Sequence, residues 1–401
     1  MEKEDLKILD IHETCTGCGA CVSACAKGAL TLEYNEEGFY YPRLNTEMCV
    51  NCRLCEKACH VINKPTLENV CRDFTPYMLK AKDEEIVRKS SSGGIFSLMA
   101  NEILKEDGIV YGARYNFEKE RLEHCSTDEC SLDELRKSKY IESYLGNTFA
   151  DVRKHLVANR KVLFCGTPCQ IKGLLTFLEA RKTSIDNLFT VRFICHGVPA
   201  NKFFTEYKHW KEKKVGARMT SLDFRPKTQG WWESNLVMSF ANGITYDEPY
   251  RENYYYYYYY FQLNSLLRTC CYDCKQLHES VGDITIADFW GIRMYDASNK
   301  DNKGISLALV QTEKAKDMLC NINKHCTIEE LPQSAVDYIY KDAPYKMTLL
   351  AKRAAMMQEA IEIGYMPHAI KTLRGKIIKA KIKNNIKFIL KKSGIWKIIR
   401  R

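Results

Sequence analysis

Two runs of four cysteines near the N-terminus have the residue type and spacing of metal ligands. Within each run the cysteines are separated by two, two and three residues. The runs consist of Cys15, Cys18, Cys21 and Cys25, and of Cys49, Cys52, Cys55 and Cys59. A short loop with a thiolate at every third position wraps around one iron–sulfur cube, and the fourth cysteine reaches the other cube. The spacing therefore predicts two [4Fe–4S] clusters, with Cys59 completing the first set and Cys25 the second.

Zinc is the alternative for these cysteines, because two C-x2-C pairs can form a tetrahedral Zn²⁺ site. Eight ligands in two complete runs suit two cubes better than two zinc ions at this spacing. The proline that usually follows the fourth cysteine is replaced by Ala26 and His60. That proline directs the chain and binds no metal, so the cluster interpretation holds. Gly17, Gly19 and Gly28 suit a backbone that turns tightly and donates N–H groups to sulfur.

Four cysteines farther along the chain form a candidate third set. Cys169 and Cys195 lie in Gly/Pro-containing turns that follow predicted strands at residues 161–164 and 191–194, and Cys271 and Cys274 form a C-x2-C pair. Ligands gather at the C-terminal ends of strands in α/β sheets, so these turns can converge. We expect a third [4Fe–4S] cluster here. Two alternatives stay open, namely buried cysteines that act as small apolar side chains and a structural zinc.

The remaining cysteines show no ligand spacing. Cys165 and Cys270 adjoin the third set and are spare candidates for it. The others are interpreted as structural: Cys71, Cys125, Cys130, Cys320 and Cys326.

A mixed α/β pattern must position the later cysteines. A Ser/Gly loop at residues 90–94 leads into an amphipathic stretch at residues 95–104 that predicts a helix, and residues 108–113 predict a buried strand. A helix is also expected at residues 170–178, and a strand with a glycine-rich turn at residues 282–291. The Ser/Gly loop can cradle a phosphate at a helix N-terminus or act as an ordinary helix cap, and the sequence leaves both open.

Taken in chain order, these segments resemble the coenzyme F420 hydrogenase/dehydrogenase β-subunit family, in its bacterial branch with a fused ferredoxin domain. The motifs that carry the resemblance occupy residues 89–96, 108–113, 163–170, 195–199, 271–275 and 282–291. The resemblance implies a flavoprotein fold that binds FAD beside a [4Fe–4S] cluster. It implies flavin phosphate contacts at Ser91, Ser92, Gly93 and Gly94, and a cofactor-adjacent turn with Gly282, Asp283 and Asp288. It also places Cys169, Cys195, Cys271 and Cys274 among the family's clustered cysteines.

The expected fold class is α+β, with a ferredoxin-like 2[4Fe–4S] domain, a mixed α/β flavin-binding domain and a basic helical tail. The expected divisions are residues 1–65 for the ferredoxin-type domain, 66–150 and 151–345 for the N- and C-terminal parts of the β-subunit fold, and 346–401 for the tail.

The charge of the chain is concentrated in its tail. The formal net charge is +10, but residues 374–401 hold 11 of the 60 basic residues and no acidic one, so the rest is close to neutral. A nucleic-acid-binding body spreads positive charge over a folded face, so nucleic acid is not an expected partner. Isoleucines and lysines alternate along residues 374–401 as in an amphipathic helix, which either contacts an anionic membrane surface or packs on the protein or a partner. With a charged start and no long apolar run, the sequence favours a cytoplasmic protein, peripheral at the inner membrane face if the tail binds there.

These features predict an iron–sulfur flavin-dependent oxidoreductase. Electrons from a ferredoxin or another redox protein are expected to pass through the clusters to FAD and on to an organic acceptor. Family context suggests a small molecule or a sugar- or lipid-linked compound of surface-polysaccharide biosynthesis. Three alternatives remain: an electron-transfer subunit without its own substrate, a subunit that reduces or oxidises coenzyme F420, and a membrane-associated scaffold with vestigial redox sites.

Overall fold

The computed structural model describes most of the chain, namely residues 6–63, 73–233, 235–249, 266–274, 281–340 and 343–392, with residues 255, 256, 259 and 264. The expected domain boundary at residue 65, Cys71 and the last part of the tail after residue 392 lie outside the described residues. The predicted α+β class is confirmed.

A small N-terminal domain carries the eight cysteines of the two runs. Its regular elements are two short helices and one antiparallel strand pair: α1 (Ala20–Ala24), α2 (Leu54–Lys57), β1 (Leu30–Tyr34) and β2 (Tyr40–Leu44). Leu30 and Leu32 alternate with exposed residues on β1 and are buried. They pack with the cysteines in one apolar cluster, so the cysteine loops form part of this domain's core.

An eight-stranded mixed sheet forms the centre of the molecule, in the order β13-β3-β12-β11-β7-β6-β4-β5. The four neighbouring strands β11, β7, β6 and β4 run parallel, so their C-terminal ends lie at one edge. Both expected parts, 66–150 and 151–345, contribute strands, so the boundary expected between them divides a single sheet. The strands are β3 (Thr75–Ala81), β4 (Ile109–Asn116), β5 (Arg121–Ser126), β6 (Val162–Gly166), β7 (Leu188–Phe193), β11 (Ile284–Asp288), β12 (Ser306–Val310) and β13 (Cys326–Glu330).

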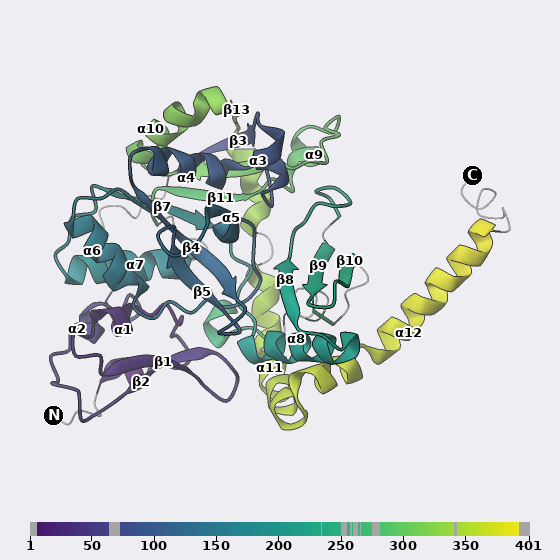
Figure 1. Ribbon diagram of the computed structural model, residues 1–401, viewed down its shortest axis with the longest axis horizontal. Coiled ribbons are helices and arrows are strands. Elements are labelled where there is room, and N and C mark those ends of the chain that lie inside the picture. The colour runs from purple at the N-terminus through teal and green to yellow at the C-terminus, as the bar shows by residue number, and fades with distance from the viewer. Residues whose placement is uncertain are drawn as a thin grey trace.

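Helices cover both faces of this sheet. On one face α4 (Ile95–Lys105) and α10 (Glu313–Ile322) pack together, and on the other α6 (Thr148–Val157) and α7 (Pro168–Ala180) do so. Helices α6 and α7 lie next to α1 and α2 of the N-terminal domain (Figure 1). Helix α7 begins sharply because Thr167 and Gln170 form a capping box around Pro168. The remaining short helices here are α3 (Glu84–Arg88), α5 (Leu132–Leu135) and α9 (Ile292–Tyr295).

The C-terminal part packs around a second, three-stranded antiparallel sheet. Its elements are α8 (Asn201–Val215), β8 (Met219–Asp223), β9 (Asn235–Phe240), β10 (Thr245–Pro249), α11 (Ala343–Ile363) and α12 (Tyr365–Lys392). Aromatic residues of α8 contact Tyr256 and Tyr259, which are buried. The start expected for the tail, residue 346, falls inside α11. Helix α12 projects beyond the rest of the protein (Figure 1). Within the described residues, no helix has the length and apolar character to cross a membrane.

Candidate functional site

The first thiol set consists of Cys15, Cys18, Cys21 and Cys59. The first three lie on the loop into α1 and at α1 itself, and Cys59 follows α2. Burial raises the pKa of the Cys18 thiol, and the neighbouring sulfurs of Cys59 and Cys15 add to this rise. The pKa of Cys21 is likewise raised by burial and by Cys18, Cys15 and Cys59. The four sulfurs predicted for one cluster are therefore brought together in a water-poor pocket.

The second thiol set consists of Cys25, Cys49, Cys52 and Cys55. Burial raises the pKa of Cys55 to about 11, and the nearby sulfurs of Cys25 and Cys52 contribute. Cys52 is exposed, whereas Cys55 is buried. The second set thus lies at the surface of the N-terminal domain, and the first lies inside.

The two cysteine loops repeat one backbone conformation. Gly17 and Gly19 have φ angles of 67° and 75°, in the left-handed region that glycine adopts without strain. Asn51 and Arg53 occupy the equivalent positions of the second loop, with φ angles of 53° and 56°. Arginine in this conformation costs roughly 1–2 kcal/mol. The second loop therefore keeps the same left-handed turn although it has no glycine at these positions.

Helix α7 joins the first thiol set to the third. A Cβ atom added at Gly173 would lie 2.7 Å from the Sγ atom of Cys18, so the helix backbone touches that sulfur. Cys169 lies one turn earlier on the same helix, and its sulfur contributes to the raised pKa of Cys18. Glycine is the one residue that allows this approach. The N-terminal domain therefore docks its first thiol set directly against the element that carries Cys169.

The third thiol set consists of Cys169, Cys195, Cys271 and Cys274. Burial raises the pKa of Cys169 to about 12, with contributions from Cys274 and Cys271. Burial also raises the pKa of Cys195, with contributions from Cys271, Cys169 and Cys274. The turns after β6 and β7 and the C-x2-C pair therefore lie close together. The spare candidate Cys270 points to the N-terminal domain, where its Sγ donates to the main-chain oxygen of Cys15 at 3.4 Å.

Main-chain N–H groups donate to sulfur in two of the sets. Ala29 N lies 3.3 Å from Cys25 Sγ, and Asn51 N lies 3.4 Å from Cys49 Sγ. In the third set, the N–H of Gly197 donates to Cys195 Sγ, also at 3.4 Å. Such hydrogen bonds stabilise thiolates that ligate iron–sulfur clusters. The third set shares this feature with the dicluster loops.

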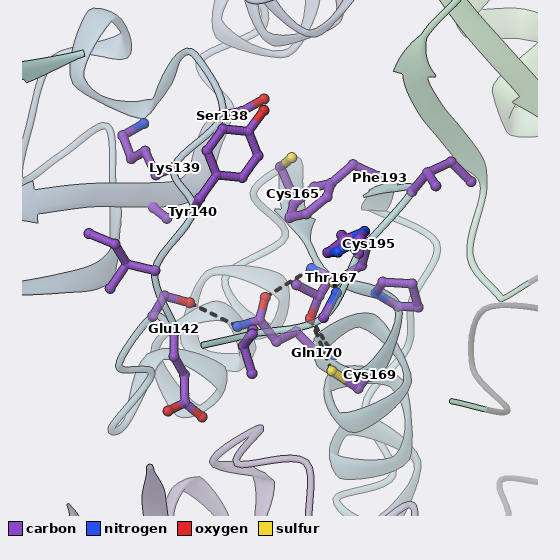
Figure 2. A pocket seen from close by; sticks show the side chains of 18 of the residues that line it. Ser138, Lys139, Tyr140, Glu142, Cys165, Thr167, Cys169, Gln170, Phe193 and Cys195 are labelled. Atoms are coloured by element: carbon purple, nitrogen blue, oxygen red, sulfur yellow. Dashed lines mark hydrogen bonds between the residues drawn. The ribbon is translucent and has the colours of Figure 1, made fainter. Parts of the chain in front are cut away.

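A cavity of about 1330 Å³ lies at the C-terminal edge of the parallel strands, next to the third set. All four cysteines of that set line it, together with Gly17 and His60 of the N-terminal domain. Figure 2 shows Ser138, Lys139, Tyr140 and Glu142 along one side, and Cys165, Cys169 and Cys195 along the other. Gln170 ties the two sides together, because its Nε2 donates to Ser143 Oγ at 2.8 Å and its Oε1 accepts from Thr167 N at 2.9 Å.

The Ser/Gly loop reaches the cavity, but only part of it faces inward. Ser91, Ser92 and Gly94 line the cavity. Ser91 Oγ accepts a hydrogen bond from Ser138 N at 2.8 Å, which leaves its hydroxyl proton available. Ser92 Oγ donates to the main-chain oxygen of Ile305, and Gly93 N donates to Ser306 Oγ. Ser91 and the N-terminus of α4 are therefore the groups in this loop with donors to offer.

The glycine-rich turn expected beside the cofactor is split between two ends of β11. Gly282 and Asp283 precede the strand and are not among the residues that line the cavity. Asp283 accepts hydrogen bonds from the main-chain N–H and hydroxyl of Thr190 and from the hydroxyl of Thr312, so it joins strand ends at the far edge. Gly282 and Asp283 therefore lie at the N-terminal end of β11. The cavity is at the other end of this strand, where Asp288 lies.

Asp288, at the C-terminal end of β11, does line the cavity. Its carboxylate accepts from Arg225 Nη1 at 2.9 Å and from Trp231 Nε1 at 2.8 Å. The guanidinium of Arg225 lies 5.0 Å from the centroid of the Trp290 ring, and both residues line the cavity. Asp288 therefore holds the Arg225 guanidinium and the Trp231 indole in place at the wall of the cavity.

Sequence reasoning missed several polar groups of the cavity. The Nδ1 atoms of His60 and His124 and the Nε atom of Arg136 are buried without a hydrogen-bond partner among the described residues. Burial lowers the pKa of His60 to about 3 and that of His124 to about 4, so both rings are neutral. The replacement of the usual proline by His60 was the one available signal. Unpaired buried polar atoms around a cavity indicate groups that a ligand can satisfy.

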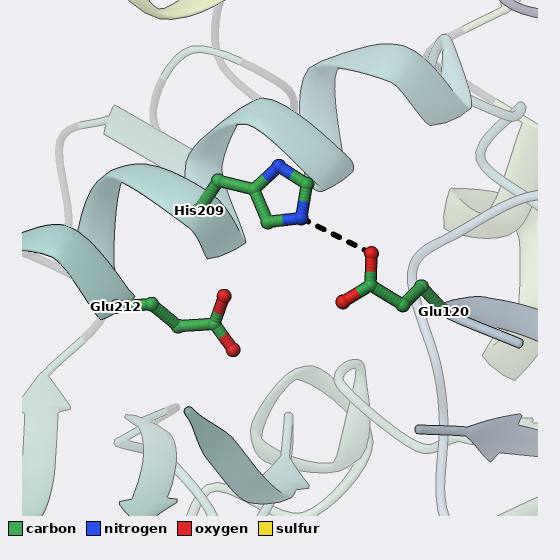
Figure 3. Close-up of side chains that lie close together, drawn as sticks. All are labelled: Glu120, His209 and Glu212. Atoms are coloured by element: carbon green, nitrogen blue, oxygen red, sulfur yellow. Dashed lines mark hydrogen bonds and ion pairs between the residues drawn. The ribbon is translucent and has the colours of Figure 1, made fainter. Parts of the chain in front are cut away.

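Glu120, His209 and Glu212 form a separate cluster on the surface that resembles a metal site (Figure 3). The buried ammonium of Lys208 contacts both carboxylates, at 2.5 Å from Glu120 and 2.8 Å from Glu212. His209 Nε2 lies 3.1 Å from Glu120. The lysine already supplies the positive charge that a metal ion would bring, so this cluster is an ion-pair network.

Two family models match parts of this chain. Residues 159–335 match the family model of the C terminus of the coenzyme F420 hydrogenase/dehydrogenase beta subunit, and residues 14–62 match a 4Fe–4S dicluster domain. No curated protein matches the sequence. A chain in a solved structure of the F420-reducing [NiFe] hydrogenase complex from Methanosarcina barkeri is 17% identical, with a TM-score of 0.45. The match covers 70% of this chain and 91% of that one. The chain therefore combines a 4Fe–4S dicluster domain at residues 14–62 with a region, residues 159–335, that is similar to the C terminus of the coenzyme F420 hydrogenase/dehydrogenase beta subunit.

Proposed function

We propose that this protein is an iron–sulfur flavoprotein oxidoreductase that accepts electrons from a ferredoxin or a similar redox protein and reduces an organic acceptor in the cavity. The position of Cys169 is the observation that carries the proposal. Its sulfur is close enough to Cys18 to shift the pKa of that thiol, and it also lines the cavity. The third thiol set therefore connects the N-terminal domain with the space where an acceptor can bind.

The three thiol sets fit iron–sulfur clusters by the chemistry of their donors. Each set gathers four thiols, and backbone N–H groups donate to sulfurs of the second and third sets. Bound [4Fe–4S] clusters supply one-electron transfer at potentials set by such hydrogen bonds and by burial. We assign the first set to Cys15, Cys18, Cys21 and Cys59, the second to Cys25, Cys49, Cys52 and Cys55, and the third to Cys169, Cys195, Cys271 and Cys274.

The exposed edge of the second set suits docking of an electron donor. Cys52 is exposed, and next to it Val50 is 59% exposed and Met48 46% exposed. Transient electron-transfer partners bind through small interfaces, so their complexes dissociate quickly. Val50 and Met48 form a small apolar surface beside the exposed Cys52, which suits such a complex. A donor bound there would lie next to the second thiol set, with the buried first set behind it.

The cavity offers hydrogen-bond donors that can bind the phosphates of FAD. Helix α4 begins at the cavity with Gly94 as its N-cap and no side-chain cap, so its first N–H groups can bind phosphate. Ser91 adds a hydroxyl, and Arg136 an unpaired Nε–H. A flavin supplies both one-electron and two-electron exchange, which joins clusters to organic substrates. Gly93, Gly282 and Asp283 are left out of this assignment because of their positions.

The cavity has room for an acceptor besides the flavin. Its volume of about 1330 Å³ exceeds the roughly 300–1,000 Å³ of a typical pocket for one ligand. Arg225 and Trp290 form a wall that suits a flat or sugar-like molecule carrying negative charge. A sugar- or lipid-linked compound of surface-polysaccharide biosynthesis follows from family resemblance, and a coenzyme F420-like deazaflavin is the second candidate.

We further propose that α12 holds the protein at an anionic membrane surface. Ile378, Ile382 and Ile386 repeat every four residues and are about half exposed, at 49%, 54% and 52%. The sequence from residue 374 onward is basic and has no acidic residue. An apolar stripe flanked by basic residues binds such surfaces through both burial and charge.

The proposed function is tested by electron transfer to flavin. The full chain, prepared anaerobically with its clusters, is mixed with FAD and then with reduced ferredoxin, and flavin absorbance is followed. We expect about one FAD per chain and flavin reduction that is slowed at least tenfold in Cys169→Ser but not in Cys165→Ser. Circular dichroism of both variants checks that they fold.

Each contrary result favours one alternative. If the chain binds no FAD, the scaffold interpretation is favoured. If flavin is reduced equally fast in Cys169→Ser, the third set is not on the path. If bound flavin is never reoxidised by any organic acceptor, the chain is an electron-transfer subunit without its own substrate.

A further inference from the structure

Cys125 and Cys130 form a close thiol pair outside the three thiol sets. Cys125 is on β5 and only 3% exposed, and Cys130 lies in the following turn and is partly buried. Their Sγ atoms are 3.0 Å apart and share a hydrogen bond. Disulfide formation requires the sulfurs to move about 1 Å closer, to about 2.05 Å. The pair can therefore close with a small local movement.

The turn between the two cysteines is fixed by hydrogen bonds. The main-chain N–H groups of Glu129 and Cys130 both donate to Ser126 O, at 3.0 and 3.1 Å. The Glu129 carboxylate accepts from Ser126 N at 2.9 Å and from its hydroxyl at 3.0 Å. These bonds hold Cys130 over Cys125, so the closeness of the two sulfurs is built into the fold.

The surroundings give the two thiols different reactivity. The hydrogen bond from Cys125 lowers the pKa of the Cys130 thiol, and the Arg114 guanidinium lowers it further against the opposing effect of burial. The same hydrogen bond and burial raise the pKa of Cys125. Arg114 is held at the turn because its Nη1 donates to Glu129 O at 3.4 Å. Cys130 is also the more exposed of the two thiols, so a small disulfide reaches it first and Cys125 resolves the intermediate.

We propose that Cys125 and Cys130 are a redox-active dithiol that forms an intramolecular disulfide by exchange with a small-molecule disulfide such as oxidised glutathione. The Cys130 thiolate attacks one sulfur of the small disulfide, so a mixed disulfide forms and one small thiolate leaves. Cys125 loses its proton to solvent and attacks the Cys130 sulfur, which forms the internal S–S bond and releases the second small thiolate. Two electrons pass from the protein dithiol to the small disulfide, which becomes two thiols.

The disulfide would restrain one wall of the cavity. Cys130 adjoins Ser131, the N-cap of α5, and the residues after α5 line the cavity. Asp133 of α5 pairs with Lys89 at 2.8 Å, and Ser138 N donates to Ser91 Oγ. Residues 131–140 therefore cover the Ser/Gly loop, and closing the disulfide ties them to β5. This inference does not depend on which cofactor fills the cavity.

The pair can be examined within one tryptic peptide. Cleavage after Arg121 and Arg136 gives residues 122–136, which contain both cysteines and no lysine or arginine before the end. The full anaerobic chain is equilibrated in glutathione buffers of increasing oxidation, quenched in acid, alkylated and digested. We expect the peptide to change from doubly alkylated to unalkylated and lighter by two hydrogens. The peptide with residues 317–324 carries the exposed Cys320 as its one cysteine, and we expect this thiol to be either alkylated or bound to one glutathione.

Two comparisons make the result decisive. In the guanidinium-unfolded chain, the disulfide should require a glutathione ratio at least about tenfold more oxidising, because the fold no longer holds the turn. In Cys130→Ser, Cys125 should stay alkylated in the same buffers. A peptide that remains doubly alkylated, or that oxidises equally in folded and unfolded chains, would overturn the proposal. Hydrogen exchange of residues 131–140 should slow several-fold in the disulfide form, and unchanged exchange would refute the restraint of the cavity wall.

Discussion

The guanidinium of Arg268 donates a hydrogen bond of 3.0 Å to the main-chain oxygen of Cys15, the first cysteine of the first thiol set. Arg268 is buried and lies just before the cysteines of the third set. Its Nη2 also donates to Glu142 Oε1 and to Tyr40 O, both at 2.6 Å. One side chain therefore ties together the N-terminal domain, the wall of the cavity and the segment that carries Cys271.

Replacing Arg268 should destabilise this junction. In Arg268→Met the Glu142 carboxylate, whose pKa burial already raises, loses the cation beside it. Removing one partner of a buried pair costs about 3–5 kcal/mol. We expect a lower midpoint of urea unfolding under anaerobic conditions and loss of iron from the first thiol set. The control is Arg88→Met, since Arg88 and Glu85 pair at the exposed surface, where we expect no measurable change. Equal unfolding midpoints in Arg268→Met and the wild type would refute the role of this residue.

Gly173 should be intolerant of even one added methyl group. The Cβ atom of alanine would lie 2.7 Å from Cys18 Sγ and 3.1 Å from Cys18 Cβ, so the cysteine loop must move. In Gly173→Ala we expect a changed electron paramagnetic resonance spectrum of the reduced protein and a lower iron content. Gly375→Ala is the matched control, because nothing lies within 4 Å of its Cβ position and alanine favours a helix by roughly 1 kcal/mol. If both variants give the wild-type spectrum, α7 does not contact the first thiol set as described.

Lys227 should make stability depend on pH. Its Nζ donates to the main-chain oxygens of Val87, Ser92 and Lys303, and burial lowers its pKa to about 7. In the unfolded chain the lysine stays protonated up to about pH 10.4. Between these values the unfolded state binds more protons, so stability rises with pH. We expect the free energy of unfolding of the wild type, relative to Lys227→Met, to increase from pH 7 to pH 9.

The exposed Lys213, replaced by methionine, serves as the control for that measurement. Its difference from the wild type should be the same at both pH values. If the Lys227→Met difference is also constant, the ammonium of Lys227 keeps its charge in the fold and our explanation fails.

The apolar stripe of α12 should mediate membrane contact. Replacing Ile378, Ile382 and Ile386 together by serine leaves the positive charge of the tail intact but removes the exposed apolar surface. We expect at least tenfold weaker co-sedimentation with vesicles of phosphatidylglycerol and phosphatidylcholine, and weak binding of either protein to pure phosphatidylcholine. Unchanged binding of the variant would leave charge alone as the cause, and no binding of the wild type would remove the membrane proposal.

The sequence predicted several of the helices and strands around the cavity and the grouping of the cysteines. The helix at residues 95–104 and the strands around residues 109, 162 and 191 are confirmed. The N-terminal sets could be anticipated because their cysteines are local and repeat at fixed spacing. The third set could be anticipated because parallel strands end at one edge of a sheet, which brings Cys169 and Cys195 together despite their separation in sequence.

Other features of the site depend on packing that no local pattern reports. Gly282 and Asp283 are close to Asp288 in sequence, but a strand carries them to the opposite edge. The contact of Gly173 with Cys18 and the contacts of Arg268 join residues far apart in the chain. A glycine inside a predicted helix was a weak signal for the first of these. Cys125 and Cys130 were interpreted as structural, because their proximity depends on a turn that the spacing alone does not indicate.

We propose that three thiol sets, each binding a [4Fe–4S] cluster, lead from the protein surface to one cavity. Iron and acid-labile sulfide per chain, measured on anaerobically prepared protein, test it most directly. We predict about twelve iron atoms for the wild type and for Cys165→Ser, and about eight for Cys195→Ser. About eight iron atoms in the wild type, unchanged in Cys195→Ser, would contradict the account.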